Sequence, residues 1–304
     1  MERIAAIDIG SNTLRLLIAE KNRDSFRSLL RDRAIVRLGR GFYPHLLLTP
    51  PAVEQALKVL LRFRELSDQE GAGEIRAVAT GVLREAKNGE PFLKKVKETT
   101  GIAVRVISGR EEAQWTAAGI LSVFPEADQG AVLFDIGGGS TEFVRYHRKV
   151  LEEIVSLPLG VVALTERFLA HDPPTDEEVE RLREHCRIIL RKNLVHHDTL
   201  IRLIGTAGTA TTLAAVYKGL KEYRPEVING TALSRDWLDA LIGRLISQKI
   251  QERATWKGLE PGRADIIVAG SLLVREVMDF FKQETLEISD AGLLEGVILK
   301  REWG

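Results

Sequence analysis

The 304-residue chain has only one cysteine, Cys186, and no long apolar run. A single cysteine cannot form an internal disulfide, which excludes the disulfide-framed secreted proteins and fits a reducing environment. No run reaches the roughly 18 apolar residues that a membrane-spanning helix needs. The first apolar strand starts close to Met1, which leaves no room for a signal peptide. We therefore expect a cytoplasmic protein with no membrane partner.

Two common nucleotide-binding motifs are also missing. No segment has the form G-x-x-x-x-G-K-[ST], which argues against P-loop chemistry, and Gly205–Gly208 lacks the third glycine of a dinucleotide-binding loop. The formal net charge is 0, but residues 1–120 carry 20 Lys and Arg against 15 Asp and Glu. This excess favours a polyanion as the partner, although ordinary scatter of surface charge explains it equally well. We do not expect nucleic acid as a partner.

The strongest positive signal is a phrase that occurs twice. Ala5–Thr13 and Val132–Glu142 each consist of an apolar run, an aspartate, glycines and hydroxyl residues. More apolar residues follow each segment. This order predicts a buried strand, a tight turn and a returning strand. Glycines let backbone N–H groups approach an anion, and hydroxyls add donors. An aspartate beside phosphate would repel it unless a cation intervenes, so the doubled loop suggests a phosphate chain and a metal held between two related halves.

The rest of the chain alternates strands with helices, which predicts an α/β fold, and its length favours two domains. We expect β structure over residues 1–48, including Ala34–Gly39, and then a helix that Thr49 caps. Strands are expected at Ile75–Thr80, Ala103–Ile107, Ile201–Gly205 and Leu286–Ile288. Ser108 with Glu111, and Thr175 with Glu178, have the spacing of helix capping boxes.

Two further side chains have the right setting for catalysis. Glu111 and Glu112 lie at a predicted helix start, where the helix dipole favours carboxylates. Glu111 is explained by the capping box, whereas Glu112 points about 100° further round the helix and is available to orient water. Arg84 follows the break between a strand and a helix, a position that often carries site residues in α/β sheets.

Together these phrases resemble the exopolyphosphatase / guanosine pentaphosphate phosphohydrolase family of the actin, hexokinase and heat-shock-chaperone ATPase superfamily. The matching phrases run from end to end: Asp8–Thr13, Val36–Gly41, Ala79–Ala86, Val106–Ala113, Asp135–Glu142, Leu157–Gly160 and Ser289–Gly296. The resemblance implies two ribonuclease-H-like domains with a cleft between them. One would cover residues 1–120 with the C-terminal helix 291–304, and the other residues 121–290.

The resemblance also implies roles for individual residues. Glu112 corresponds to the catalytic base and Arg84 to an arginine that contacts substrate phosphate. Asp135 and Glu142 correspond to residues that hold a divalent cation, expected to be Mg²⁺. The residues expected to bind phosphate are Asp8, Gly10, Ser11, Asn12, Thr13, Gly137, Gly138, Gly139, Ser140, Thr141, Gly205, Thr206, Gly208 and Thr209. Family members often dimerise, so a homodimer is possible.

The chain departs from the family pattern in two places. Many members have Thr-Ser-Ala before the Leu-Arg-Glu-Ala phrase, whereas Gly81-Val82 here removes one hydroxyl near Arg84. Long members also have a further C-terminal helical region, so the chain resembles the short, two-domain form. The implied function is exopolyphosphatase activity, with guanosine pentaphosphate (pppGpp) hydrolysis as the alternative. A nucleotide-binding sensor without turnover and a sugar or acetate kinase are further alternatives from other classes.

Overall fold

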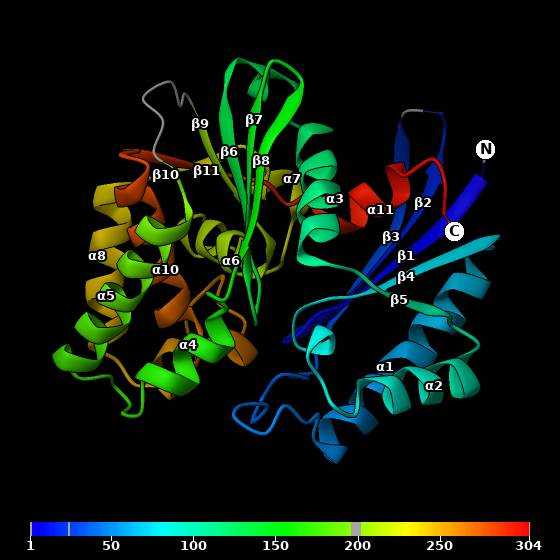
Figure 1. Cartoon of the computed structure of the whole chain (residues 1–304), viewed down its shortest axis with the longest axis horizontal. Coiled ribbons are helices and arrows are strands. Elements are labelled where there is room, and N and C mark those ends of the chain that lie inside the picture. The colour runs from blue at the N-terminus through cyan, green and yellow to red at the C-terminus, as the bar shows by residue number, and fades with distance from the viewer. Residues whose placement is uncertain (1, 24, 196–201, 304) are drawn as a thin grey trace. The chain divides into compact units, whose positions relative to one another are not determined.

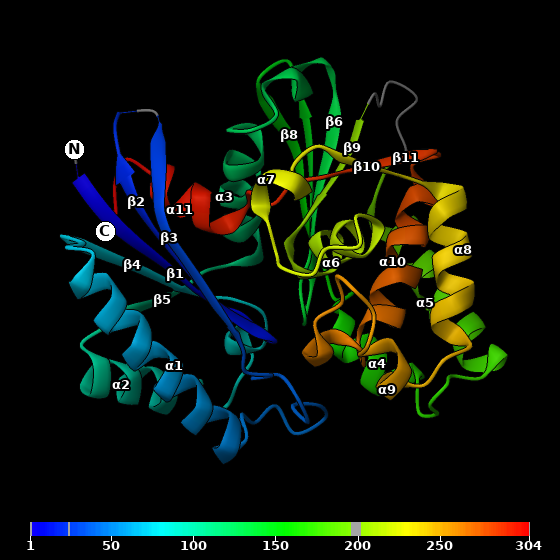
Figure 2. The ribbon, with the colours of Figure 1, turned by 180° about the vertical axis from the view of Figure 1, so that it is seen from behind.

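The computed structural model describes residues 2–23, 25–195 and 202–303, and the chain divides into two compact units. Unit 1 comprises Met1–Ser122 and Gly292–Gly304, and unit 2 comprises Val123–Ala291. The ribbon in Figures 1 and 2 shows that each unit is built on a twisted sheet flanked by helices. In the described part of the chain, no helix is long and apolar enough to cross a membrane.

Unit 1 has a five-stranded sheet with the order β3-β2-β1-β4-β5. Its strands are β1 (Glu2–Ile9), β2 (Thr13–Lys21), β3 (Phe26–Ile35), β4 (Glu74–Ala79) and β5 (Val104–Val106). Strands β1, β2 and β3 are antiparallel neighbours, while β4 runs parallel to β1 and β5 parallel to β4. Its α-helices are α1 (Pro50–Gln69), α2 (Gly89–Thr100), α3 (Gly109–Leu121) and α11 (Leu293–Leu299).

Alternate residues of β1 enter two different cores of unit 1. Ile7 packs into the core that contains the apolar residues of α1 and α2, whereas Ala6 packs with Trp115 of α3 and Val297 of α11. Successive side chains of a strand point to opposite faces, so α1 and α2 cover one face and α3 and α11 cover the other. Asp8 has the parity of Ala6 and therefore belongs to the α3 and α11 face.

Unit 2 repeats this arrangement with additions. Its sheet has the order β10-β11-β9-β6-β7-β8, built from β6 (Ala131–Ile136), β7 (Thr141–His147), β8 (Val150–Leu157), β9 (Arg202–Thr206), β10 (Thr231–Ser234) and β11 (Thr285–Ile288). The order β8-β7-β6-β9-β11 matches β3-β2-β1-β4-β5 of unit 1. Its helices are α4 (Val161–Phe168), α5 (Asp176–Asn193), α6 (Ala207–Tyr217), α7 (Pro225–Ile228), α8 (Arg235–Ile246), α9 (Ile250–Arg253) and α10 (Ile267–Phe280). The prediction of an α/β fold with a doubled strand-turn-strand unit is confirmed.

Glycines allow helices α3 and α11 of unit 1 to pack with their backbones in contact. A Cβ atom at Gly296 would lie 1.8 Å from the carbonyl oxygen of Trp115, and one at Gly119 would lie 1.9 Å from that of Gly292. Such contacts are possible only without side chains. They fix α3, whose first turn carries Glu112, against the rest of unit 1.

Most local predictions are confirmed and two are wrong. The capping boxes of Ser108 with Glu111 and of Thr175 with Glu178 are present. Residues Val36–Gly39 are not a strand, because β3 lies earlier in the chain and ends at Ile35. β3 carries three arginines, which its position at the edge of the sheet tolerates better than a central strand would. Thr49 occupies the N-cap of α1, but its side chain makes no capping hydrogen bond.

The capping box at Glu178 predicts acid sensitivity of unit 2. Burial raises the pKa of this carboxyl, but hydrogen bonds from the backbone N–H groups of Thr175 and Ala170 and from His171 outweigh it and lower the pKa from 4.5 to about 2. A lowered pKa contributes stability above pH 4.5, and this contribution is lost as the pH falls towards 2. We expect the free energy of unfolding in urea to fall over this range, and Glu178→Gln to flatten the fall. The exposed neighbour Glu177→Gln is the control, and an unchanged pH profile in Glu178→Gln would contradict the assignment.

Candidate active site

The turn between β1 and β2 is closed on itself and anchored to the loop after β3. Its Gly10 N–H donates to the carbonyl oxygen of Thr13 at 3.2 Å. The carbonyl of Asn12 accepts from the N–H groups of Val36 and Arg37, both at 2.9 Å, and that of Ser11 accepts from Gly39 at 2.6 Å. The carbonyls of the turn are therefore used within unit 1, so they do not oppose an approaching anion.

Asp8 at the end of β1 is neutralised by an arginine on the neighbouring strand. One carboxylate oxygen, Oδ2, accepts from Arg15 Nε at 2.9 Å and from Arg15 Nη2 at 2.7 Å. Its other oxygen lies 3.4 Å from the hydroxyl of Thr80. The sequence predicts a cation beside this aspartate, and in the structure the guanidinium of Arg15 occupies that position. Asp8 is only 2% exposed and holds Arg15 in a defined orientation.

The structure brings Arg84 and Glu112 together in unit 1. Arg84 ends the short 3₁₀ helix Gly81–Arg84 that follows β4, and its Nη1 forms an ion pair with Glu112 Oε2 in the first turn of α3. The Glu112 residue is 6% exposed. Its neighbour Glu111 is used by the capping box, where hydrogen bonds from the Ser108 backbone, against a smaller effect of burial, lower its pKa. The sequence suggested these two residues separately, but nothing in it indicated that they pair.

Ser11 connects the β1–β2 turn to the segment that carries Arg84. Its Oγ accepts from the Val82 N–H at 3.1 Å, and a Cβ atom at Gly81 would lie 2.1 Å from that oxygen. The space beside Gly81 is filled by the Ser11 hydroxyl. Gly81 also has φ +55°, a left-handed conformation that glycine adopts without strain.

Substitution of Gly81 tests this connection. We expect Gly81→Ala to lower the free energy of unfolding by about 1–2 kcal/mol through the left-handed backbone. We also expect it to raise KM for the phosphate substrate that the sequence predicts, because Ser11 must move. The control is Gly41→Ala, since Gly41 has φ +66° but open space around a Cβ atom. Urea unfolding and phosphate-release kinetics measure the two effects. Equal KM values in the two variants would show that the Ser11 contact does not shape the site.

The turn between β6 and β7 in unit 2 has the same closure. The Gly137 N–H donates to the Ser140 carbonyl at 2.9 Å, as Gly10 does to Thr13. The carbonyls of Gly137 and Gly138 each accept from the first turn of α4 at 3.0 Å. Two of the predicted phosphate-binding hydroxyls are used inside unit 2: Thr141 Oγ1 donates to Leu159 O at 2.6 Å, and Thr206 Oγ1 donates to Ala291 O at 3.0 Å.

Asp135 and Glu142 are opposed across β6 and β7 and fit a divalent cation. They are register partners, so their side chains lie on the same face, and they are 4% and 1% exposed. Glu142 Oε1 accepts from Ser140 at 2.7 Å and from Ser156 at 2.8 Å. Two adjacent buried carboxylates repel each other, and a divalent cation relieves this repulsion. Among the described residues no group of three or more His, Cys, Asp or Glu side chains that could hold a metal ion is present.

The segment Gly205–Thr209 brings an arginine that the sequence did not indicate. It spans the end of β9 and the start of α6, and a Cβ atom at Gly208 would lie 2.1 Å from Arg263 Nη1. Arg263 is 7% exposed, and its Nε donates to Glu260 Oε2 at 3.0 Å. Gly208 is therefore needed so that this guanidinium can lie over the start of α6. Arg263 belongs to no motif, so only the fold reveals it.

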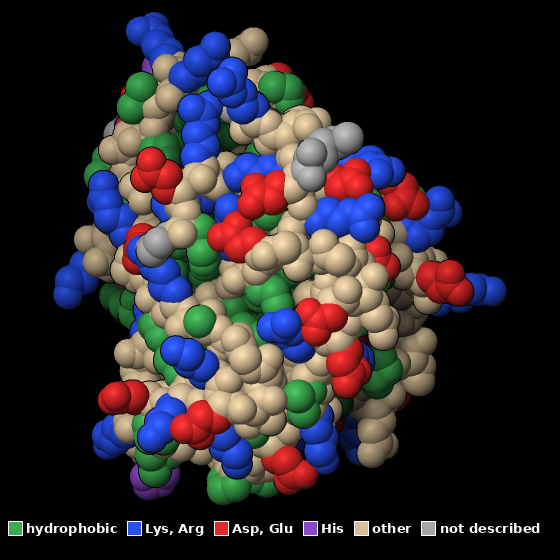
Figure 3. Space-filling view, turned by 90° about the vertical axis from the view of Figure 1, so that its right-hand side faces the viewer, with side chains coloured by type: hydrophobic (Ala, Val, Ile, Leu, Met, Phe, Trp, Pro, Cys, Tyr) green, Lys and Arg blue, Asp and Glu red, His purple; other side chains and the backbone are tan. Residues whose placement is uncertain are grey.

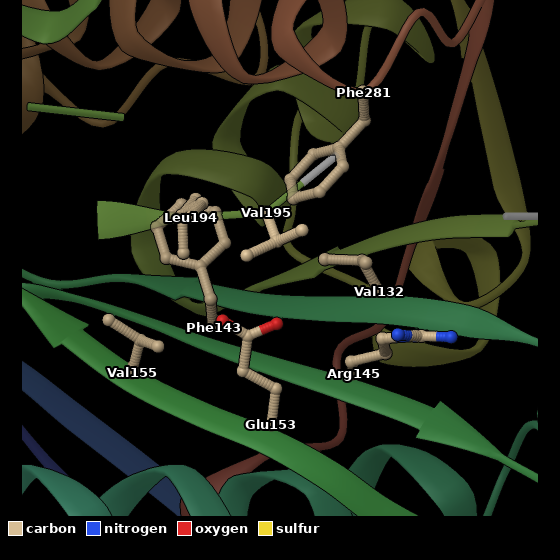
Figure 4. A pocket seen from close by; sticks show the side chains of 8 residues that line it. All are labelled: Val132, Phe143, Arg145, Glu153, Val155, Leu194, Val195 and Phe281. Atoms are coloured by element: carbon tan, nitrogen blue, oxygen red, sulfur yellow. The ribbon is translucent and has the colours of Figure 1, made fainter. Parts of the chain in front are cut away.

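An apolar pocket of unit 2 lies on the other face of its sheet. Figure 4 shows its lining residues, Val132, Phe143, Arg145, Glu153, Val155, Leu194, Val195 and Phe281. Val132 and Phe143 point into the core formed with α5 and α10. By strand alternation Asp135 and Glu142 point to the opposite face. The pocket is therefore separate from the acidic pair, and Arg145, its basic lining residue, is ion-paired with Glu152 at 3.0 Å.

Comparison with known proteins identifies the family. A model described as the Ppx/GppA phosphatase family matches residues 17–302. Exopolyphosphatase 2 of Mycobacterium tuberculosis is 32% identical over 314 residues, covering 98% of each chain. A bifunctional 3-dehydroquinate synthase/phosphatase of Fusobacterium nucleatum is 33% identical over 97% of this chain, which spans 46% of that longer protein.

Solved structures show the same relationship. The Aquifex aeolicus PPX-GPPA enzyme superposes with a TM-score of 0.82 at 33% identity, covering 98% of this chain and 99% of that one. An exopolyphosphatase from Cytophaga hutchinsonii gives a TM-score of 0.88 at 27% identity, covering 97% and 96%. These similarities confirm the expected pair of ribonuclease-H-like domains of the actin-like fold. The chain belongs to the Ppx/GppA phosphatase family.

Proposed function

We propose that the protein is an exopolyphosphatase, which hydrolyses the terminal phosphoanhydride of inorganic polyphosphate and releases orthophosphate. The observation that carries this proposal is the Arg84–Glu112 pair beside the β1–β2 turn. A buried carboxylate and a guanidinium are thereby held next to a turn with backbone and hydroxyl groups. Hydrolysis of a phosphoanhydride requires these three elements, a group to orient water, a cation for the phosphate and donors for its oxygens.

Each residue then has a defined part in the reaction. Arg84 binds the terminal phosphate. Its guanidinium thereby exchanges the Glu112 carboxylate for the substrate phosphate as its ion-pair partner. Glu112 accepts a hydrogen bond from the attacking water and takes its proton as the P–O bond forms. The leaving phosphate chain departs with the electron pair of the broken bond. Donors of the β1–β2 turn, whose carbonyls are already engaged, stabilise the phosphoryl oxygens.

Asp135 and Glu142 would hold Mg²⁺, with Ser140 and Ser156 fixing the orientation of Glu142. A bound divalent cation neutralises phosphate charge and polarises the phosphoryl group. The acidic pair is at the same position in the unit 2 fold as Asp8 and Arg15 in unit 1, because both pairs are register partners of the first hairpin. We propose the remaining residues of the β6–β7 turn, with Gly205 and Thr209, as further phosphate donors.

The first experiment compares phosphate release from polyphosphate, pppGpp and ATP in the presence of Mg²⁺. Fastest release from polyphosphate supports the proposal, and fastest release from pppGpp assigns the protein to the alternative substrate. Tight binding of ATP by calorimetry without phosphate release would instead identify a nucleotide sensor. Replacement of Mg²⁺ with EDTA tests the cation, and undiminished release would overturn the role of the acidic pair.

A further inference from the structure

Helix α3 carries a hydroxyl that is cut off from water and from hydrogen-bond partners. Charged side chains of both signs are interspersed on the face of the molecule in Figure 3, where water can hydrogen-bond them. Thr116 of α3 is only 3% exposed, and its Oγ1 has no hydrogen-bond partner among the residues that the structure describes. Buried polar groups are hydrogen-bonded with few exceptions, so each exception requires an explanation.

This hydroxyl also differs from those of threonines on other helices. Thr100 of α2, Thr165 of α4 and Thr211 of α6 each donate to the carbonyl oxygen four residues earlier, at 2.7–2.9 Å. Such a bond to the preceding turn is a common partner for a threonine within a helix. For Thr116 that carbonyl belongs to Glu112, and the bond is not made. The Thr116 hydroxyl can therefore donate to another acceptor.

The carboxylate of Glu112 is an acceptor on the same face of α3. Residues four apart are neighbours on a helix, with Cβ atoms about 5–6 Å apart, and helical side chains tilt towards the N-terminus. The Thr116 side chain is therefore directed towards the turn of α3 that carries Glu112. Glu112 is 6% exposed, so water is a poor substitute partner for either group.

In the proposed reaction the Glu112 carboxylate gains from such a donor. In the structure it forms an ion pair with Arg84. When Arg84 binds the terminal phosphate, this ion pair breaks, and breaking a buried ion pair is costly because a charge stays behind in a poorly solvated site. A hydroxyl donor within reach lowers that cost, because hydrogen bonds to ionised groups are stronger than those between neutral groups.

We infer that Thr116 is a positioning residue of the active site, whose hydroxyl donates to the Glu112 carboxylate once Arg84 has moved to the substrate. This inference rests on the proposed function. The hydrogen bond forms only with phosphate on Arg84, so it stabilises the substrate complex and the transition state alike. Its contribution therefore appears in KM rather than in kcat. In the protein without substrate, the unpartnered hydroxyl costs stability.

The test compares Thr116→Val, which keeps the branched shape but removes the hydroxyl, with Thr116→Ser, which keeps the hydroxyl. In Thr116→Val we expect KM for polyphosphate to rise about tenfold, the loss of one hydrogen bond to a charged group, with kcat changed less than about threefold. Thr116→Ser should stay within about threefold of the wild-type KM. The midpoint of urea unfolding of Thr116→Val should be unchanged or higher, because the substrate-free protein loses no hydrogen bond.

Thr100→Val is the matched control on another helix of unit 1. It removes a hydroxyl that already has two partners, the carbonyl of Val96 at 2.8 Å and the N–H of Ile102 at 3.1 Å. We expect it to lower the midpoint of urea unfolding and to leave KM unchanged, the opposite of Thr116→Val in both respects. A lowered midpoint with an unchanged KM in Thr116→Val would show a structural role only and overturn the inference.

A double-variant comparison tests whether Thr116 acts through Glu112. Binding of orthophosphate, measured by calorimetry, should weaken about tenfold in Thr116→Val. It should be equal in Glu112→Ala and in the double variant of Glu112→Ala with Thr116→Val, because the acceptor is already missing. A further loss of phosphate affinity in the double variant, or an equal rise of KM in Thr116→Val and Thr116→Ser, would overturn the inference.

Failure of the proposed function is seen separately, as absence of phosphate release by the wild type from polyphosphate. In that case the calorimetric comparison with orthophosphate decides alone. A loss of phosphate affinity in Thr116→Val that is absent in Thr116→Ser would still support the contact with Glu112. Equal affinities in the wild type and both variants would refute it.

Discussion

Glu112→Gln is expected to reduce the rate of phosphate release from polyphosphate by about 10²–10⁴-fold, the usual contribution of a general base. Glutamine keeps the size of the side chain and its place in the first turn of α3, but it cannot accept a proton. The loss should appear in kcat rather than in KM, since Glu112 acts on water and not on the substrate. Initial rates at saturating polyphosphate, with folding checked by circular dichroism, measure it.

The adjacent Glu111→Gln provides the matched control. Glu111 occupies the next position of the same helix but is used by the capping box with Ser108 and by Arg105. Its loss should lower the free energy of unfolding by about 1 kcal/mol and leave kcat within a few-fold. If Glu112→Gln retains kcat within a few-fold as well, Glu112 is not the base, and the ion pair with Arg84 has only a structural role.

The sequence could predict the two turns because their signal is local. In each, an apolar strand contains an aspartate near its end, and a glycine follows two residues later, as in Asp8-Ile9-Gly10 and Asp135-Ile136-Gly137. Strand alternation and turn chemistry depend only on such near neighbours. The capping boxes were predictable for the same reason, because their hydrogen bonds join residues three apart.

The partners across strands could not be predicted in the same way. Arg15 neutralises Asp8, and Ser156 fixes Glu142, because strand register opposes these residues. Register depends on the position of every strand, and β3 was expected too late in the chain, over residues 34–39. With β3 misplaced, Arg33 could not be assigned as the register partner of Arg15. Arg263 was missed for a related reason, since its contact with Gly208 joins segments more than fifty residues apart.

Glu142→Gln is the second substitution with a large expected effect. It removes one of the two carboxylates proposed to hold Mg²⁺, while Ser140 and Ser156 can still donate to the remaining amide oxygen. The affinity for Mg²⁺ should fall strongly, and phosphate release at limiting Mg²⁺ should fall by at least about tenfold, the lower end for disturbed metal shells. Mn²⁺ binding, followed by electron paramagnetic resonance or calorimetry, gives a readout that does not depend on turnover.

Ser156→Ala tests the positioning of the Glu142 carboxylate separately from its proposed binding of the cation. It removes one of two hydrogen bonds to Glu142 Oε1 but leaves the charge of the acidic pair unchanged. We expect a smaller loss of cation affinity than in Glu142→Gln, and Ser156→Thr should restore part of it. High Mg²⁺ should rescue Ser156→Ala more fully than Glu142→Gln, because an intact but mobile carboxylate can still be recruited by mass action. If Glu142→Gln binds Mn²⁺ as tightly as the wild type, the acidic pair does not hold the cation, and the buried repulsion between Asp135 and Glu142 must be relieved in another way.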